Sequence, residues 1–200
     1  MNLLFIDTSQ KNLRVGVMLD DKVLYQNTLL NITSHSIYLV NEINMAFNSL
    51  KISLDDIDKI LVVVGPGSFT GIRIGLTVSK VMAWSKQIPI VSVSALKASA
   101  ISSNFLGIRI ISLKDKENLY LGVYSDNLET IIEDMYVKSD FLESYLSVLD
   151  NPYTVIDVQD GYFDIPKVMN YYKNFDGENA HGIKPNYLKE LYYKKVNNNG

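Results

Sequence analysis

The sequence contains no cysteine, which excludes disulfide bonds, thiolate catalysis and any zinc or iron–sulfur site built on cysteine. Long hydrophobic runs are also missing, since the longest, such as Ile60 to Val64, fall far short of the ~20 residues that cross a bilayer. The two histidines, His35 and His181, lie far apart and show no metal-ligand spacing. Membrane insertion and cysteine- or histidine-based metal chemistry are therefore not expected, and a reducing cytoplasm is the expected location.

The charge balance is slightly acidic, with 19 basic and 22 acidic residues and a net charge of −3. Proteins that bind nucleic acid by themselves usually carry a basic stripe, and no such stripe is present. Apolar residues make up 47% and charged residues 20% of the chain, as in ordinary globular proteins. Direct, independent binding to nucleic acid is therefore not expected.

Hydrophobic periodicity predicts an α/β protein with two lobes. Three strand-like runs come first, at 3–6, 13–19 and 22–28, followed by helices and strands in alternation at 34–49, 60–64, 69–86, 90–93 and 94–102. The second half starts in the same way, with strands at 108–113, 119–124 and 130–137, a helix at 139–149 and a strand at 153–158. This order predicts mixed sheets covered by helices, with an N-terminal lobe at 1–100 and a smaller C-terminal lobe and tail at 101–200.

The densest motif is glycine-rich and joins the strand at 60–64 to the helix at 69–86. It contains Gly65, Pro66, Gly67, Ser68, Phe69, Thr70, Gly71, Ile72, Arg73, Ile74 and Gly75. The spacing is neither that of a P-loop nor that of the dinucleotide fingerprint. Two interpretations remain open: an anion site at the start of the helix, or a tight turn with close helix packing. In either case Arg73 is expected near the turn or an interface.

A second candidate is the polar turn Asp7, Thr8 and Ser9, which follows the first strand. Hydroxyl groups in such a turn can hold a nucleotide's phosphates while a carboxylate holds water or magnesium. An ordinary strand-ending turn is the alternative.

The two long helices are more apolar than a helix with one buried side requires. Since a helix that is apolar all round is buried on all sides, a second set of apolar residues should meet another lobe or another chain. The candidates for this interface are Tyr38, Leu39, Met45, Val78 and Met82.

The motif from Gly65 to Gly75 resembles the signature of the TsaB (YeaZ) family. Four other segments are similar to that family as well, namely 6–9, 35–36, 88–96 and 185–189. The resemblance implies an actin-like, sugar-kinase-like (ASKHA) fold with a reduced second lobe and close kinship to the catalytic subunit TsaD.

The resemblance also implies a role in making threonylcarbamoyladenosine in tRNA. The chain would be a non-catalytic subunit that binds and activates TsaD as a heterodimer, with TsaE in a larger assembly and tRNA contacted only through the complex. Alone, it would form a homodimer. It would need no cofactor of its own, since ATP and a metal ion are expected on the partner subunits.

Two other functions are weighed against this one. The metal-binding histidines of TsaD align with Ala95 and Ser99, which argues against a metallopeptidase. A free-standing ATPase or phosphotransferase of the same fold would need a second phosphate loop and a catalytic carboxylate, and neither can be identified in the sequence.

Overall fold

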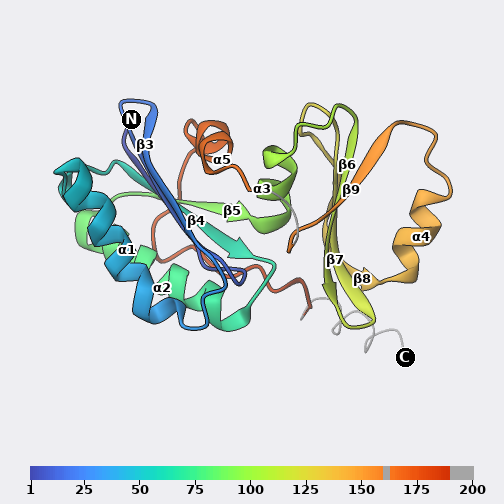
Figure 1. Ribbon diagram of the computed structural model, residues 1–200, viewed down its shortest axis with the longest axis horizontal. Helices are drawn as coiled ribbons and strands as arrows, with labels where there is room; N and C mark the ends of the chain where they lie inside the picture. Colours follow the sequence, from blue (N-terminus) through green and yellow to red (C-terminus); the bar gives the residue numbers. More distant parts are fainter. Residues whose placement is uncertain (160–162, 190–200) are drawn as a thin grey trace. The chain divides into compact units, whose positions relative to one another are not determined.

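The computed structural model describes residues 1–159 and 163–189, which form two compact units (Figure 1). The first unit contains residues 1–95 together with 164–185, and the second contains the described residues from Leu96 to Phe163 and from Asn186 onward. Each unit is built on its own sheet, so the predicted two-lobed α/β fold is confirmed. The helices at 34–49 and 69–86 and the order of the strands are also as predicted.

A five-stranded sheet forms the centre of the first unit. In chain order its strands are β1 (Leu3–Asp7), β2 (Leu13–Leu19), β3 (Lys22–Leu29), β4 (Lys59–Gly65) and β5 (Ile90–Ser94). Their order in the sheet is β3-β2-β1-β4-β5, with β1, β2 and β3 antiparallel and β4 parallel to both β1 and β5. The two residues between β2 and β3, Asp20 and Asp21, both have positive φ, which suits a two-residue hairpin. All seven residues of β4 are buried, as its continuous apolar sequence predicts.

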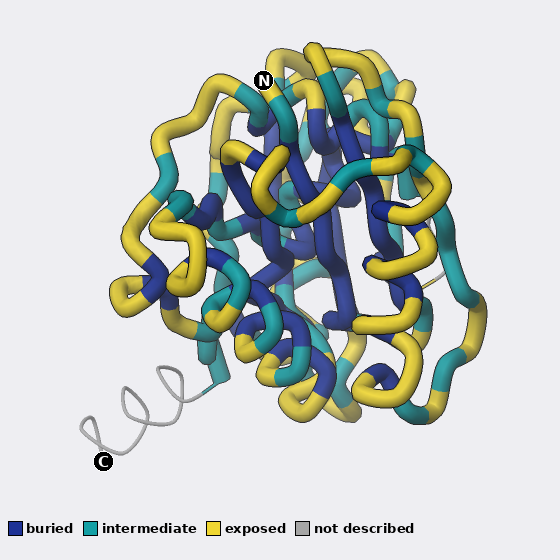
Figure 2. Tube along the Cα trace, turned by 90° about the vertical axis from the view of Figure 1, so that its left-hand side faces the viewer, coloured by how far each residue is buried: buried dark blue, intermediate teal, exposed yellow. Residues whose placement is uncertain are grey.

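Helices cover both faces of this sheet, and the strands form a buried layer between them (Figures 1 and 2). On one face, α1 (His35–Leu50) and α2 (Phe69–Lys86) pack on alternate residues of β1, including Leu4 and Ile6. On the other face lies α5 (Ile165–Tyr172), which approaches β2 at Gly16 so closely that a Cβ there would lie 2.6 Å from Ile165. The sheet is thus buried on both sides by segments from distant parts of the chain.

The division into units differs from the sequence boundary at residue 100, because residues 164–185 return to the first unit. Lys59 donates hydrogen bonds to the carbonyls of Lys173 and Phe175, which fix the end of α5 beside β4. Glu178 then pairs with Ile90 at the outer edge of β5, through two backbone hydrogen bonds of 2.8 and 2.9 Å. The returning segment therefore completes the first unit.

The second unit is smaller and contains a four-stranded sheet. Its strands are β6 (Ile108–Asp115), β7 (Asn118–Tyr124), β8 (Thr130–Lys138) and β9 (Tyr153–Asp157), in the order β8-β7-β6-β9. One face packs against α3 (Ala95–Ser102) and the other against α4 (Asp140–Leu146). No helix among the residues described in either unit is long and apolar enough to cross a membrane.

The closing segment 185–189 reaches the second sheet through Lys189. The Lys189 ammonium lies 2.7 Å from a carboxylate oxygen of Asp115, and the hydroxyl of Tyr136 donates to the same oxygen at 2.7 Å. These two hydrogen bonds hold the pKa of Asp115 below its ordinary value, and the ion pair raises the pKa of Lys189. The cluster ties the end of the described chain to β6 and β8.

We expect Asp115→Asn to lower the free energy of unfolding by about 1 kcal/mol or less at pH 7, because the ion pair is partly exposed. A carboxylate with a lowered pKa contributes stability above its unfolded-state pKa of about 3.9 and loses that contribution as the pH falls through its folded-state pKa. The stability difference from wild type should therefore shrink below about pH 4 in urea titrations. Asp150→Asn, at an exposed position, is the control. A difference that persists unchanged at pH 3 would contradict this role.

Candidate functional site

The turn that follows β1 is buried in the first unit and is closed to solvent. The exposed fractions of Asp7, Thr8 and Ser9 are 1%, 1% and 0%. A turn that holds a nucleotide must present its hydroxyl and carboxylate groups to the ligand. These three side chains instead point into contacts within the chain.

Both carboxylate oxygens of Asp7 have partners inside the unit. Oδ1 accepts hydrogen bonds from the backbone N–H of Ser9 at 2.8 Å and from its hydroxyl at 2.7 Å. Oδ2 forms an ion pair with the Arg14 guanidinium at 2.7 Å, and both side chains are almost fully buried. Arg14 is directly opposite Asp7 in the β1–β2 register. Sequence reasoning missed this partner, although a cross-strand pairing of the two runs would have identified it.

The start of α2 packs directly on the turn. The backbone N–H of Ser68 donates to the Ser9 carbonyl at 2.7 Å, and the Thr8 hydroxyl donates to the Gly71 carbonyl at 2.7 Å. The Ser68 hydroxyl in turn accepts from the backbone N–H of Gly71 and caps the helix. The N–H groups of Ser68 and Gly71 thus both have partners within the chain.

Three glycines of the motif make this approach possible. A Cβ at Gly67 would lie 2.2 Å from the Ser9 carbonyl oxygen, and one at Gly71 would lie 2.1 Å from that of Thr8. A Cβ at Gly75, one turn further along α2, would lie 2.4 Å from the Thr8 hydroxyl. These distances are far below van der Waals contact, so a larger residue would force the helix and the turn apart. They favour close packing over phosphate binding as the reason for the glycines.

Small, buried residues occupy the two positions that align with the metal-binding histidines of TsaD. Ala95 is 3% exposed and Ser99 is 4% exposed, and neither provides an imidazole or carboxylate ligand. Within residues 1–159 and 163–189, no three histidine or acidic side chains gather in a way that could hold a metal ion. The metal of a TsaD-like site does not fit these residues.

The outward side of the same motif lines a pocket of about 480 Å³. Phe69 is 51% exposed, and the guanidinium carbon of Arg73 lies 3.8 Å from the centre of its ring. Ser36, from the first turn of α1, lies on the opposite wall. Arg73 therefore lies at the surface, in a pocket lined by both helices, and not at the buried turn. Its expected place at an interface stays a prediction.

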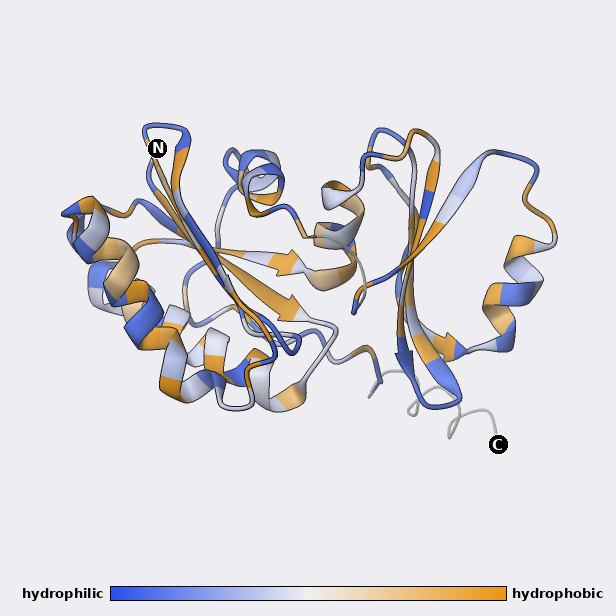
Figure 3. Ribbon diagram, in the orientation of Figure 1, coloured by the Kyte–Doolittle hydropathy of each residue, from blue (hydrophilic) through white to orange (hydrophobic). Residues whose placement is uncertain are grey.

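A longer apolar groove of about 590 Å³ continues from this pocket between α1 and α2, and the two share Thr77 and Val78. We call the pocket and the groove together the helix groove. Along both helices, hydrophobic residues alternate with hydrophilic and intermediate ones (Figure 3). The apolar walls of the groove include Val40, Ile43, Phe47, Val78, Val81 and Met82. The short 3-10 helix η1 (Leu54–Asp56) begins at one end of it.

Four of the five predicted interface residues lie at least partly at the surface. Tyr38 is 43% exposed and Met45 is 60% exposed, while Val78 and Met82 are half-buried in the groove wall. Leu39 is fully buried against the sheet and does not belong to this surface, which corrects the sequence-based assignment. Its helical position, one residue from Tyr38, turns it toward the core.

The sequence reasoning missed four other exposed apolar residues on the two helices. These are Ile37 and Val40 on α1, and Val81 and Trp84 on α2, with exposed fractions from 49% to 66%. On α2 the spacing of Phe69, Arg73, Val81 and Trp84 could have revealed one exposed stripe along the helix.

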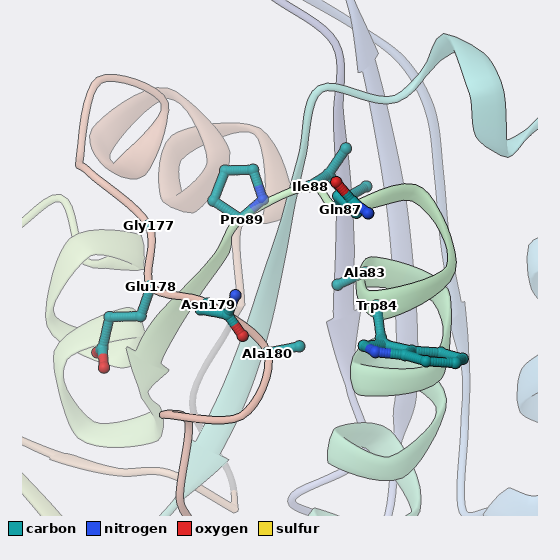
Figure 4. A pocket seen from close by; sticks show the side chains of 9 residues that line it. All are labelled: Ala83, Trp84, Gln87, Ile88, Pro89, Gly177, Glu178, Asn179 and Ala180. Carbon is teal, nitrogen blue, oxygen red and sulfur yellow. The ribbon is translucent and has the colours of Figure 1, made fainter.

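A third pocket, of about 320 Å³, lies where α2 ends (Figure 4). Ala83 and Trp84 come from the last turns of α2, and Asn179 comes from the returning segment. Glu178 also lines this pocket, and its side chain points away from α2. The helix groove remains the larger candidate surface.

The chain is thus a two-unit α/β protein in which each unit has its own mixed sheet between helices. The model of the TsaD family, described as tRNA N6-adenosine threonylcarbamoyltransferase, matches residues 29–187. The chain belongs to this family, and its sequence is similar to those of TsaB proteins.

The tRNA threonylcarbamoyladenosine biosynthesis protein TsaB of Bacillus subtilis is 33% identical over 149 residues. That match covers 72% of this chain and 65% of the relative. TsaB of Haemophilus influenzae is 25% identical over 148 residues, which cover 72% of this chain and 59% of that relative. The chain therefore spans less than two thirds of these relatives. The structure of YeaZ from Pseudomonas aeruginosa has the same fold, with a TM-score of 0.79 at 18% sequence identity. The structural match covers 94% of this chain and 99% of the YeaZ chain.

Gly71→Ala should lower the free energy of unfolding by at least about 2 kcal/mol, because the new methyl group would collide with the Thr8 backbone carbonyl. Gly182→Ala is the matched control, since its methyl group would lie 3.2 Å from the mobile end of the Glu178 side chain and should cost less than about 1 kcal/mol. Urea denaturation measures both. Equal costs for the two variants would contradict the close approach of α2 to the turn.

Arg14→Met should destabilise the chain by about 3 kcal/mol or more, because it leaves the buried Asp7 carboxylate without its cation. The double variant Asp7→Asn with Arg14→Met removes both charges and should be more stable than Arg14→Met alone. Urea denaturation of the wild type, the two single variants and the double variant gives a double-mutant cycle. An additive cycle would show that the two side chains do not stabilise each other.

Proposed function

We propose that the chain is a non-catalytic subunit of the machinery that makes threonylcarbamoyladenosine in tRNA, and that it binds and activates TsaD. The observation that carries this proposal is the apolar helix groove between α1 and α2, in a member of the TsaD family whose turn after β1 is closed. The names of the TsaB relatives support a role in the biosynthesis of threonylcarbamoyladenosine in tRNA. We infer the partners, TsaD and TsaE, from the kinship with that family.

The closed turn supports a non-catalytic role. Both oxygens of the Asp7 carboxylate and the Thr8 hydroxyl have partners within the chain, so a nucleotide would have to displace a buried ion pair to reach them. In this proposal, ATP and the metal ion are bound by the partner subunits. TsaE joins in a larger assembly, and tRNA reaches the chain only through the complex.

The helix groove supports a protein partner. Contiguous exposed apolar residues are unusual on a monomer and usually mark an interaction surface. A specific interface buries about 800 Å² on each partner, an area that two exposed helix faces can supply. TsaD shares this fold and can offer an equivalent helix pair. A homodimer of the isolated chain would use the same surface, so self-association and the TsaD complex would compete.

The alternative is a free-standing ATPase or phosphotransferase of the same fold. It requires a nucleotide site that the isolated chain can open, and it would be detected as ATP turnover by the purified protein. We expect no turnover above background. Turnover that depends on Asp7 would favour this alternative.

The double variant Met45→Glu with Val81→Glu introduces one charge on each helix of the groove, where the exposed fractions are 60% and 61%. We expect its affinity for TsaD to fall by at least about 100-fold, because the charges must be desolvated in the interface. Isothermal titration calorimetry measures the affinity, and thermal unfolding shows whether the fold is retained.

Val148→Glu is the control for these substitutions, because Val148 is 73% exposed and lies on the second unit. It should bind TsaD as the wild type does. A folded double variant with wild-type affinity would show that the partner surface lies elsewhere.

A further inference from the structure

Four strands of the first sheet have a counterpart in the second sheet. The strand order is β3-β2-β1-β4-β5 in the first and β8-β7-β6-β9 in the second, and corresponding neighbours pair in the same direction. β9 therefore has the position of β4, but no described strand lies beside it as β5 lies beside β4 (Figure 1). All residues of β4 are buried, whereas those of β9 are exposed or half-buried. A strand from an interior position of this topology thus lies at an edge.

The other three sheet edges are protected in ways that the β9 edge is not. β3 begins with Lys22, and a register shift interrupts its pairing with β2. Glu178 bridges the outer edge of β5. β8 carries Glu133, Asp134 and Lys138, and its register with β7 also shifts. Charges, irregularities and coverings of this kind keep an edge strand from pairing with another chain. β9 contains no lysine, and its register with β6 is unbroken along its whole length.

The backbone groups of β9 alternate between β6 and the open edge. The carbonyl of Pro152, just before β9, and the N–H of Val158, just after it, both bond to β6, at 3.0 and 2.9 Å. Successive residues of a strand direct their N–H and C=O groups to opposite sides. The groups of Tyr153, Val155 and Asp157 therefore point away from β6, and they have no hydrogen-bond partner among the described residues. A complete set of pairing groups is available at this edge.

The side chains at this edge are largely apolar. Tyr153 is 39% exposed and Val155 is 42% exposed. Their register partners on β6, Ile108 and Ile110, belong to the apolar cluster that packs beneath α4. Apolar side chains on an added strand would therefore extend this cluster past β9, and the main-chain hydrogen bonds would align them.

The charge of the second unit indicates what kind of chain fits this edge. Residues 96–163 contain 11 acidic and 5 basic side chains. Asp140 and Glu143 on α4 and Asp150 in the loop before β9 are exposed and form no ion pair with the described residues. Asp157 ends the strand. A second copy of this unit, or a nucleic acid, would bring further negative charge, whereas a basic segment would neutralise it.

We propose that β9 accepts an extended segment of another protein as an additional strand, in the position that β5 has in the first sheet. The segment places apolar side chains beside Tyr153 and Val155 and basic side chains near Asp150 and Asp157. This inference is independent of the proposed function, because it concerns the edge of the second sheet and not the helix groove.

The probe is the synthetic peptide acetyl-Lys-Thr-Val-Thr-Val-Thr-Lys-amide, and the first readout is amide hydrogen exchange of the full chain by NMR. We expect the amides of Tyr153, Val155 and Asp157 to exchange rapidly in the free protein and at least about tenfold more slowly with saturating peptide. The amides of Thr154 and Ile156, which point toward β6, should be slow in both states.

The second readout is the affinity for the labelled peptide, measured by fluorescence anisotropy. Val155→Lys adds a positive charge at the centre of the edge and should weaken binding by at least about tenfold. Ile131→Lys is the matched control, since Ile131 is 48% exposed on β8 at the opposite edge of the same sheet, and it should bind within about twofold of the wild type. Val155→Pro removes an outward N–H and keeps the bonds to β6, so a variant that thermal unfolding shows to be folded should also lose affinity.

Charge selection is tested with the peptide that has glutamate in place of both lysines, which should bind at least about tenfold more weakly. Absence of peptide binding, binding that leaves the exchange of these three amides unchanged, or equal losses for Val155→Lys and Ile131→Lys would overturn the proposal. Protection of the same amides in the free protein, rising with concentration as a dimer forms in sedimentation equilibrium, would assign the edge to a second copy and would overturn it as well.

Discussion

The first unit depends on how closely the start of α2 approaches the turn that follows β1. Gly67, Gly71 and Gly75 allow that approach, and two hydrogen bonds between the turn and the helix start fix it. The same contact buries Asp7, which then requires Arg14 as its cation because an isolated buried carboxylate is costly. The polar groups of the turn thereby have partners within the protein itself.

One helix connects this internal contact with the surface. The inward side of α2 carries the glycines, and its outward side carries Phe69, Arg73, Val81 and Trp84. Because both sides belong to the same rigid helix, the position of the outward side is set by the packing of the inward side. This relation gives one physical reason for a motif that combines glycines with exposed aromatic and basic residues.

Most of the fold could be predicted from the sequence, because its strands and helices have clear periodicity and turn signals. The return of residues 164–185 could not, since α5 is short and the segment around it is rich in asparagine, tyrosine and glycine. At the site, the glycines were recognised, but the partner of Asp7 was not, because the pairing depends on the register of two strands. Leu39 was misplaced because a helix apolar on several sides does not reveal which residue faces the sheet.

In the function we propose, the chain acts through TsaD and performs no chemistry of its own. The most direct measurement is threonylcarbamoyl transfer to tRNA in a reconstituted system with purified TsaD and TsaE, with and without this chain. We expect product only when the chain and TsaD are both present, and none from the chain alone. Equal product formation without the chain, or product from the chain in the absence of TsaD, would contradict it.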